Sequence, residues 1–465
     1  MANPTPQPGA LPIVVSICGP ADLTERDADR ARPSLVRQLR RLKRRYAHSS
    51  FAVATDGSHG LQHLASAAAA EVDGLSVAGE CCATCDLSLH VESAEAGGPD
   101  TRVRLERRRR RAWDDRDELR TVQLEHADTY NRDAARQRAK YADRVVASER
   151  ALVMPEGVEP SFAAARLRDI FATADSLAAR HQVLLYAAFA LVTGLGLIAT
   201  VLLALLHVLN AEWARYWFVL FVGLAFAAWY VAKRLRIHER YIEYRALAES
   251  ARIQFYWHAC GIGESTRDHC SNQMPQRLAW VQQALLSIMQ VTAPRTAAAP
   301  DAPRTAAILQ AWVDDQARYF LRTWRTARAR YRLCHRAAMT LYVIAALAEV
   351  ANVLTPGSLM QAHKPLEHAL SLTAVILLAL ATIIMAYVTK IATVYQVQHY
   401  RRMSGIYAEA QQKLVEPSAP ALHRIAVDLG RQALHENAQW AAVLTQQPID
   451  PPPSPFTKPW HDSDA

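Results

Sequence analysis

Two short turns near the N-terminus combine glycines with hydroxyl and carboxylate side chains, as phosphate-binding turns do. The first, CGPADL, ends an apolar run that begins at residue 11, and the second, TDGSHG, ends the run FAVA. Small residues let an anion approach the backbone, and the free N–H groups at the start of a following helix favour phosphate. The candidate ligand-binding residues are therefore Gly19, Asp22, Thr55, Gly57, Ser58 and Gly60.

The sequence lacks the motifs of common nucleotide-binding loops, of catalytic sites and of metal sites. Neither turn has the spacing of a Walker loop or of the dinucleotide glycine fingerprint, so a plain tight turn stays open as the alternative. No paired acid, activated nucleophile or metal constellation is recognisable, and we expect neither an enzyme nor a bound cofactor. The cysteine cluster at 81–85 has no second Cys or His pair at zinc-finger spacing, so we expect no metal.

The arginine run at 107–111 has two interpretations. It suits an anionic surface, such as RNA or lipid headgroups, or a solvated helix that is balanced by its own acids. No aromatic residues suited to base stacking alternate with the arginines, so nucleic acid is not an expected partner.

Up to about residue 160, short apolar runs alternate with helical patterns. Pro33 suits the first turn of a helix whose apolar residues share one face. The expected strands are 11–18, 51–55, 75–79 and 150–154, and the expected helices are 33–46 and 61–73. This order predicts an α/β domain with a parallel sheet of Rossmann-like winding, in which ligands bind where strand ends meet helix starts.

Four later runs are apolar enough to cross a bilayer, which takes about 20 residues in a helix. We predict transmembrane helices at 183–209, 216–232, 337–354 and 369–389. Because lipid offers no hydrogen bonds to a backbone, each span must be helical.

The distribution of positive charge predicts how these helices are oriented. Segment 233–336 holds 17 Lys and Arg against eight Asp and Glu, whereas the links 210–215 and 355–368 hold one basic residue each. Basic segments stay in the cytoplasm. We therefore expect a multi-pass protein of the inner (plasma) membrane with both termini in the cytoplasm, and no cleaved signal peptide.

Glu349 is the one acidic residue well inside a predicted span. A charge at mid-bilayer costs about 3 kcal/mol on insertion scales, so such residues often have a function. Two interpretations remain open, a boundary residue that reaches the outer headgroups and a polar group that lines a pore or contacts another helix.

The helical stretch 239–262 follows the second span and carries both an apolar stripe and charges. Arg245 and Glu249 are one turn apart and can pair. One interpretation is an ordinary packed cytoplasmic helix. The other makes Arg245, Glu249, Arg252 and Gln254 a polar seam that couples the membrane helices to the N-terminal domain.

The N-terminal stretches ICGPADL, FAVATDGSHGLQHLASAAAAE and YADRVVASERALVMPEG resemble the SLOG superfamily, Rossmann-like domains related to the LOG nucleotide-processing enzymes. Gly19, Asp22 and Gly60 match its turns, whereas Gln62 stands where an Asp is usual. The Gly-Gly-Thr loop and the enzymes' Pro-Gly-Gly motif are missing. The resemblance implies a nucleotide sensor with a degenerate pocket and no catalytic residues.

Residues 160–447 are similar to the SLATT membrane-effector families, which pair two spans with a cytoplasmic helix. LRDIFATADSLAARHQ, HERYIEYRALAESARIQFYWHACGI and LGRQALHENAQW carry this resemblance. A helix before each pair of spans and a Tyr-Arg helix after it form a loose repeat. The resulting divisions are a SLOG-like domain at 1–160, SLATT-like units at 161–290 and 308–447, an Ala/Pro linker at 291–307 and a Pro-rich tail at 448–465.

Together the resemblances imply a membrane effector, controlled by a nucleotide-sensing-type domain in bacterial conflict signalling, with pore formation as its proposed output. The alternative is a non-catalytic membrane scaffold whose degenerate domain binds a protein. The candidate partners are the lipid bilayer, a nucleotide and further copies of the chain.

Overall fold

The structure is a computed structural model of the whole chain. It describes residues 8–19, 23–55, 58–73, 75–80, 87–92, 102–105, 115–269, 278–292, 301–355, 364–390, 393–415 and 419–446. The contacts divide the chain into two compact units. We call residues 1–179, 243–317 and 406–442 the core unit, and residues 180–242, 318–405 and 443–465 the span unit.

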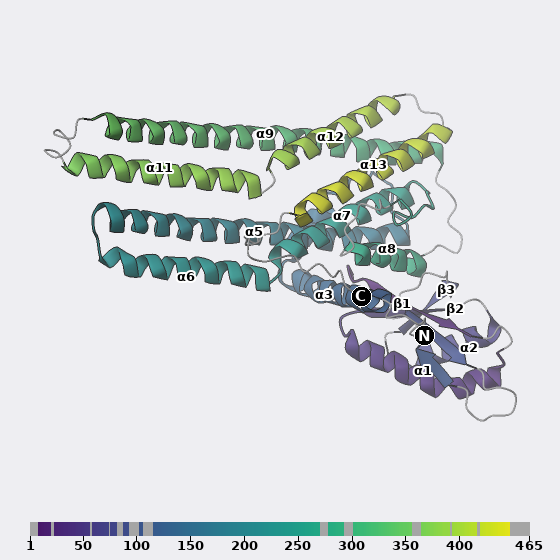
Figure 1. Cartoon of the computed structure of the whole chain (residues 1–465). Coiled ribbons are helices and arrows are strands. Elements are labelled where there is room, and N and C mark those ends of the chain that lie inside the picture. The colour runs from purple at the N-terminus through teal and green to yellow at the C-terminus, as the bar shows by residue number, and fades with distance from the viewer. Residues whose placement is uncertain are drawn as a thin grey trace, which may run out of the picture. The chain divides into compact units, whose positions relative to one another are not determined.

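A small sheet begins the core unit (Figure 1), and its strands run in the order β3-β2-β1-β4-β5. β1 pairs in parallel with β2 and β4, and β2 pairs in parallel with β3, whereas β5 is antiparallel to β4. The bounds are Pro12–Cys18 for β1, Ser50–Thr55 for β2, Leu75–Glu80 for β3, Leu87–Glu92 for β4 and Arg102–Leu105 for β5. The predicted parallel sheet at the N-terminus is thus confirmed.

Two local predictions were wrong. Residues 150–154 form a turn and an extended segment after helix α4 (Ala142–Glu149) rather than a strand. Their apolar content serves helix packing, since Leu152 is buried and the Val153 carbonyl accepts a hydrogen bond from Tyr256. Pro33 lies inside helix α1 (Glu25–Arg45) and not in its first turn, because the helix begins earlier, where the Thr24 side chain caps it by accepting a hydrogen bond from the Asp27 N–H.

Helices cover both faces of the sheet, and they come from distant parts of the sequence. α1 and α2 (His59–Glu71) pack on one face through a continuous apolar cluster. α8 (Ala279–Thr292) contacts β1 and β3 on the other face, where Val291 packs against Val14, Ala52 and Ala54. Small side chains allow this close approach. The α/β fold is therefore completed by a helix that follows the last strand of the sheet by about 170 residues of sequence.

Helix α3 (Asp115–Lys140) holds the start of β1 in place through hydrogen bonds to the backbone. The Asn131 side chain accepts from the Leu11 N–H at 2.7 Å and donates to the Leu11 carbonyl at 2.9 Å. The Tyr130 hydroxyl donates to the Gly9 carbonyl. These bonds satisfy buried backbone groups that lie just outside the sheet ladder.

The helical part of the core unit is built around α7 (Ile237–Ala259), whose residues 243–257 are buried on nearly every side. Tyr256 stacks on Trp312 of α9 (Ala302–Leu354), with ring centroids 4.7 Å apart. The Trp257 indole N–H donates to the Ala426 carbonyl of α13 (Ala419–Gln446) at 2.9 Å. The core unit thus has an aromatic centre.

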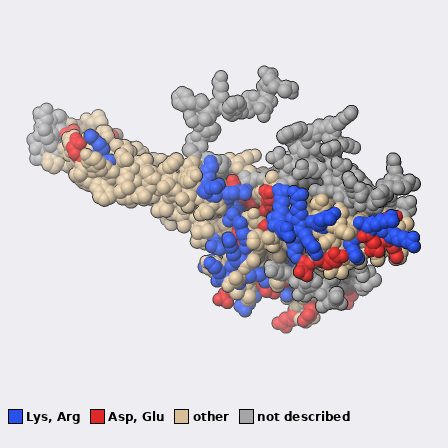
Figure 2. Space-filling view, turned by 90° about the horizontal axis from the view of Figure 1, so that it is seen from below, with Lys and Arg blue, Asp and Glu red and all other residues tan. Residues whose placement is uncertain are grey.

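Four helices among the described residues are long and apolar enough to cross a membrane, which supports the prediction of a membrane protein. They are α5 (Phe162–Val208), α6 (Trp213–Arg234), α9 and α11 (Lys364–Lys390), and α12 (Thr393–Lys413) follows. On the face that Figure 2 shows, an extended surface is tan, that is, free of charged side chains, except near its ends.

Polar and aromatic contacts join the apolar helices within the span unit. Asn352 donates to Ser371 at 3.3 Å, which links α9 to α11. Phe189 of α5 contacts Tyr387 of α11, with ring centroids 5.9 Å apart. On α6, tryptophans at 213 and 217 near one end and aromatic residues at 229 and 230 near the other match the two interfacial belts of a membrane helix.

Replacing Gly430 should test the packing of α13 on the aromatic centre. A Cβ at this position would lie 2.5 Å from the Trp257 indole, so Gly430→Ala should lower the free energy of unfolding by about 1–3 kcal/mol. Gly405→Ala is the control, since Gly405 lies in helix α12 and has nothing within 4 Å of such a Cβ. Thermal unfolding of the detergent-solubilised chain measures both, and equal effects would contradict this packing.

Candidate functional site

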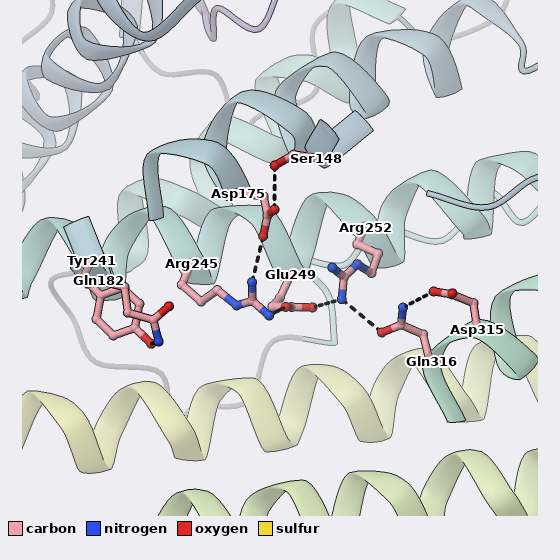
Figure 3. A network of polar contacts seen from close by, with 9 residues as sticks. All are labelled: Ser148, Asp175, Gln182, Tyr241, Arg245, Glu249, Arg252, Asp315 and Gln316. Atoms are coloured by element: carbon pink, nitrogen blue, oxygen red, sulfur yellow. Dashed lines mark hydrogen bonds and ion pairs between the residues drawn. The ribbon is translucent and has the colours of Figure 1, made fainter. Parts of the chain in front are cut away.

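Helix α7 carries charged side chains into the interior of the core unit, where burying a charge without a partner is costly. Figure 3 shows a row of polar contacts that starts at Ser148 and passes through Asp175, Arg245, Glu249 and Arg252. Their side chains come from helices α4, α5 and α7. We call this row, together with Gln316 and Asp315 of α9, the α7 network.

Arg245 joins two helices at the first half of the network. Its guanidinium donates to Asp175 of α5 at 2.8 Å, and it also forms an ion pair with Glu249 one turn along α7. The second carboxylate oxygen of Asp175 accepts a hydrogen bond from the Ser148 hydroxyl at 2.8 Å. The side chains of Asp175 and Glu249 are 18% and 17% exposed, so water screens these pairs only in part.

Arg252 forms the second half and is almost fully buried. It donates to Glu249 at 2.9 Å and to the Gln316 side-chain carbonyl of α9 at 3.1 Å. Its guanidinium also lies over the Phe171 ring of α5, 4.8 Å from the centroid. Gln316 in turn donates to Asp315 at 3.0 Å. Arg252 therefore contacts both α5 and α9, and each of these helices continues into an apolar span.

Gln254 has a different environment from the other three predicted residues. Its side chain donates to the Glu264 carbonyl at 3.0 Å and accepts from the Thr266 N–H at 2.8 Å. These bonds hold the segment that leaves α7. The structure thus brings Arg245, Glu249 and Arg252 together, whereas Gln254 fixes a neighbouring loop.

Several network residues were missed by the sequence reasoning. Asp175 and Gln316 lie 70 and 64 residues from their arginine partners, and nothing in the sequence pairs them. The other buried acids that face or flank α7 likewise have distant partners: Asp133 accepts from the Tyr244 hydroxyl at 2.8 Å, and Glu243 contacts His126 at 3.3 Å. The signal available in the sequence was an acidic residue among apolar and small neighbours in a helical stretch, as at Asp175 in FATADSLAA.

The predicted ligand-binding turns lie at the ends of two adjacent parallel strands. Ile17 is in register with Thr55, so Gly19, which follows β1, and Thr55, the last residue of β2, lie at neighbouring strand ends, and Ser58 precedes helix α2. Asp22 and Gly57 lie outside the described residues.

The two described glycines of these turns have close neighbours. A Cβ at Gly60 would collide with the Leu23 carbonyl, and one at Gly19 would lie 3.2 Å from both Leu61 and Val91. Both glycines therefore serve close packing in this conformation.

The remaining candidates from the sequence can be placed briefly. Glu349 is exposed on the apolar part of α9, near the end of that helix. The cysteine cluster at 81–85 lies outside the described residues, and the described part of the chain has no group of three His, Cys, Asp or Glu that could hold a metal.

Burial suppresses ionisation around the aromatic centre. It raises the pKa of Tyr256 and Tyr407 well above the usual range, and it raises the pKa of the Cys260 thiol to about 12. It also lowers the pKa of His258, whose ring contacts Met289 at 2.9 Å. Cys260 is thus a protonated thiol at neutral pH, unsuited to nucleophilic chemistry.

A double-mutant cycle should measure coupling across the α7 network. Asp175→Asn and Arg245→Gln each remove one partner of a largely buried pair, so we expect each to destabilise by about 1–3 kcal/mol, with a coupling energy above about 0.5 kcal/mol. The exposed pair Glu409–Lys413 on α12 is the matched control and should show less than about 0.5 kcal/mol. Coupling no larger than the control would contradict a network that joins α5 to α7.

Comparison with known proteins adds no relative to this geometry. No family model matches the chain, and the searches of curated proteins and of solved structures also found no match. The functional argument therefore depends on the residues and contacts of this chain.

Proposed function

We propose that the chain is a membrane effector in bacterial conflict signalling, in which a Rossmann-like N-terminal domain senses a nucleotide and the four apolar helices provide the output, a pore. The α7 network is the coupling element in this proposal. It supports the role because it joins helices α4, α5, α7 and α9 through largely buried polar contacts.

The observation that carries the proposal is the continuity of two helices. α5 begins with residues that are fully buried in the core unit, among them Ile170 and Phe171, and ends as an apolar span. α9 does the same with Ile308 and Trp312. Packed interiors resist gradual deformation, so a shift of either buried half moves the apolar half of the same helix.

A nucleotide suits the N-terminal domain for two reasons. The parallel strand order β3-β2-β1-β4 is the order expected of Rossmann-like winding, and the ends of β1 and β2 are neighbours. Thr55 and Ser58 would place hydroxyl groups beside a phosphate there, with the start of α2 adding backbone N–H groups. A ligand shifts the protein only if it binds one state better than the other.

A scaffold is the alternative, and one observation favours it. The Leu23 backbone already occupies the space above Gly60 that a phosphate-binding glycine would leave open. In that case the N-terminal domain binds a protein, and the spans serve as an anchor. Nucleotide binding separates the two functions.

The full chain in detergent should gain thermal stability with at least one nucleotide from a panel of linear and cyclic forms. Saturation at 100 times Kd stabilises by about 2.7 kcal/mol. Thr55→Val removes a buried hydroxyl at the strand end with little change of shape, and it should abolish that gain. The same nucleotide should raise the ion conductance of liposomes that contain the protein.

Two outcomes would count against this function. No stabilisation across the panel, with folded wild-type protein, would contradict nucleotide sensing and leave the scaffold. Stabilisation without a change in conductance would contradict the pore.

The charge distribution supports an inner-membrane protein with both termini in the cytoplasm, and labelling tests this. In a cysteine-free background, cysteines at Glu212 and Thr355 should react with a membrane-impermeant reagent in intact cells, because Glu212 directly precedes α6 and Thr355 directly follows α9, both on the side poor in basic residues. Cysteines at Ser265 and Glu409 should react only after lysis. The reverse pattern would overturn this orientation.

A further inference from the structure

The part of α9 that precedes its apolar stretch is densely basic. Between residues 318 and 336 this helix carries seven arginines and no acid, and all seven are exposed. They are Arg318, Arg322, Arg325, Arg328, Arg330, Arg332 and Arg336. Among the described residues, no ion pair with an acid is found for any of them.

Six of these arginines share one face of the helix. Apart from Arg330, each arginine follows the previous one by three or four residues. At 100° per residue this spacing places the six within about a third of the helix circumference. Arg330 lies on another side. The result is a continuous basic stripe that leads directly to the apolar stretch at 337–354.

Height along the helix separates the stripe into two parts. With a rise of about 1.5 Å per residue, Arg328 lies about 12 Å and Arg318 about 27 Å from Arg336, which borders the apolar stretch. The headgroup layer of one leaflet is about 5–8 Å thick. Extended side chains at 328, 332 and 336 can reach that layer, whereas those at 318, 322 and 325 lie beyond it.

An exposed leucine and an aromatic ring contact or flank the three arginines nearest the apolar stretch, Arg328, Arg332 and Arg336. The Leu333 side chain is 70% exposed between Arg332 and Arg336, a position that suits the boundary between headgroups and acyl chains. The Arg328 guanidinium lies over the Trp324 ring, 5.3 Å from its centroid. An exposed leucine among unpaired cations fits a lipid surface better than it fits a soluble anion.

We propose that Arg328, Arg332 and Arg336, together with Leu333, form a binding surface for anionic phospholipid headgroups. The surface would fix the height of α9 in the bilayer. The inference depends on the proposed membrane function. Since the lipid preference is measurable in detergent, its failure is distinguishable from failure of the labelling or conductance experiments.

The test compares two triple variants of the full chain. Phosphatidylglycerol and phosphatidylcholine are titrated onto the detergent-solubilised protein, and bound lipid is counted by native mass spectrometry. Arg328→Gln, Arg332→Gln and Arg336→Gln together should lower the preference for phosphatidylglycerol by about a hundredfold, at about 1 kcal/mol for each arginine. The matched control, Arg318→Gln, Arg322→Gln and Arg325→Gln, removes equal charge from the same helix and should change the preference by less than about threefold.

Three outcomes would overturn the proposal. They are an equal loss of phosphatidylglycerol preference in both triple variants, no loss in the variant at 328, 332 and 336, and full displacement of the lipid by inorganic phosphate. An equal loss would indicate general charge attraction, and displacement by phosphate a simple anion site. If the variant at 328, 332 and 336 does not fold, Arg332→Gln and Arg322→Gln carry the same comparison, with about fivefold loss expected for the first alone.

Discussion

A helix that is buried on nearly every side can hold charged side chains only if each has a partner inside the protein. α7 is such a helix, and Arg245, Glu249 and Arg252 pair with one another along it. Further partners come from α5, where Asp175 pairs with Arg245, and from α9, where Gln316 accepts a hydrogen bond from Arg252, so both helices must approach α7 at fixed heights for these buried groups to be satisfied. Removing one partner would leave the other as an uncompensated buried charge. Much of the helical part of the core unit depends on this requirement.

The sheet and the helices also depend on each other. One face of the sheet would be left uncovered without α8, which follows α7 along the chain. The side chains of Ala52 and Ala54 on that face are small, so α8 can pack close to the sheet there. The N-terminal domain is therefore completed by the helical part of the protein, and the bonds that Gln254 makes to the segment after α7 hold the chain at the start of this connection. A change at the sheet has a short covalent and packed route to α7.

The span unit shows a different balance of forces. Only 6–17% of the most apolar stretch of each of its four long helices is buried. In water such a surface would drive aggregation, whereas in a bilayer it is the expected outer surface. Polar links such as Asn352–Ser371 give neighbouring helices a defined register. The exposed Glu349 lies on the same apolar surface and takes part in neither the Asn352–Ser371 nor the Tyr342–Thr382 hydrogen bond between α9 and α11.

The sequence by itself determined the features that depend on local composition. The length of the apolar runs predicted the four long helices, and the short apolar runs near the N-terminus predicted β1, β2 and β3. Both features depend on residues that are neighbours in the chain. It also placed Arg245 one turn from Glu249. Only the tertiary structure decided that Asp175 and Gln316 complete the α7 network and that residues 150–154 pack against helices instead of joining the sheet. These outcomes depend on contacts between residues far apart in the chain, and such contacts leave no periodic pattern in one sequence.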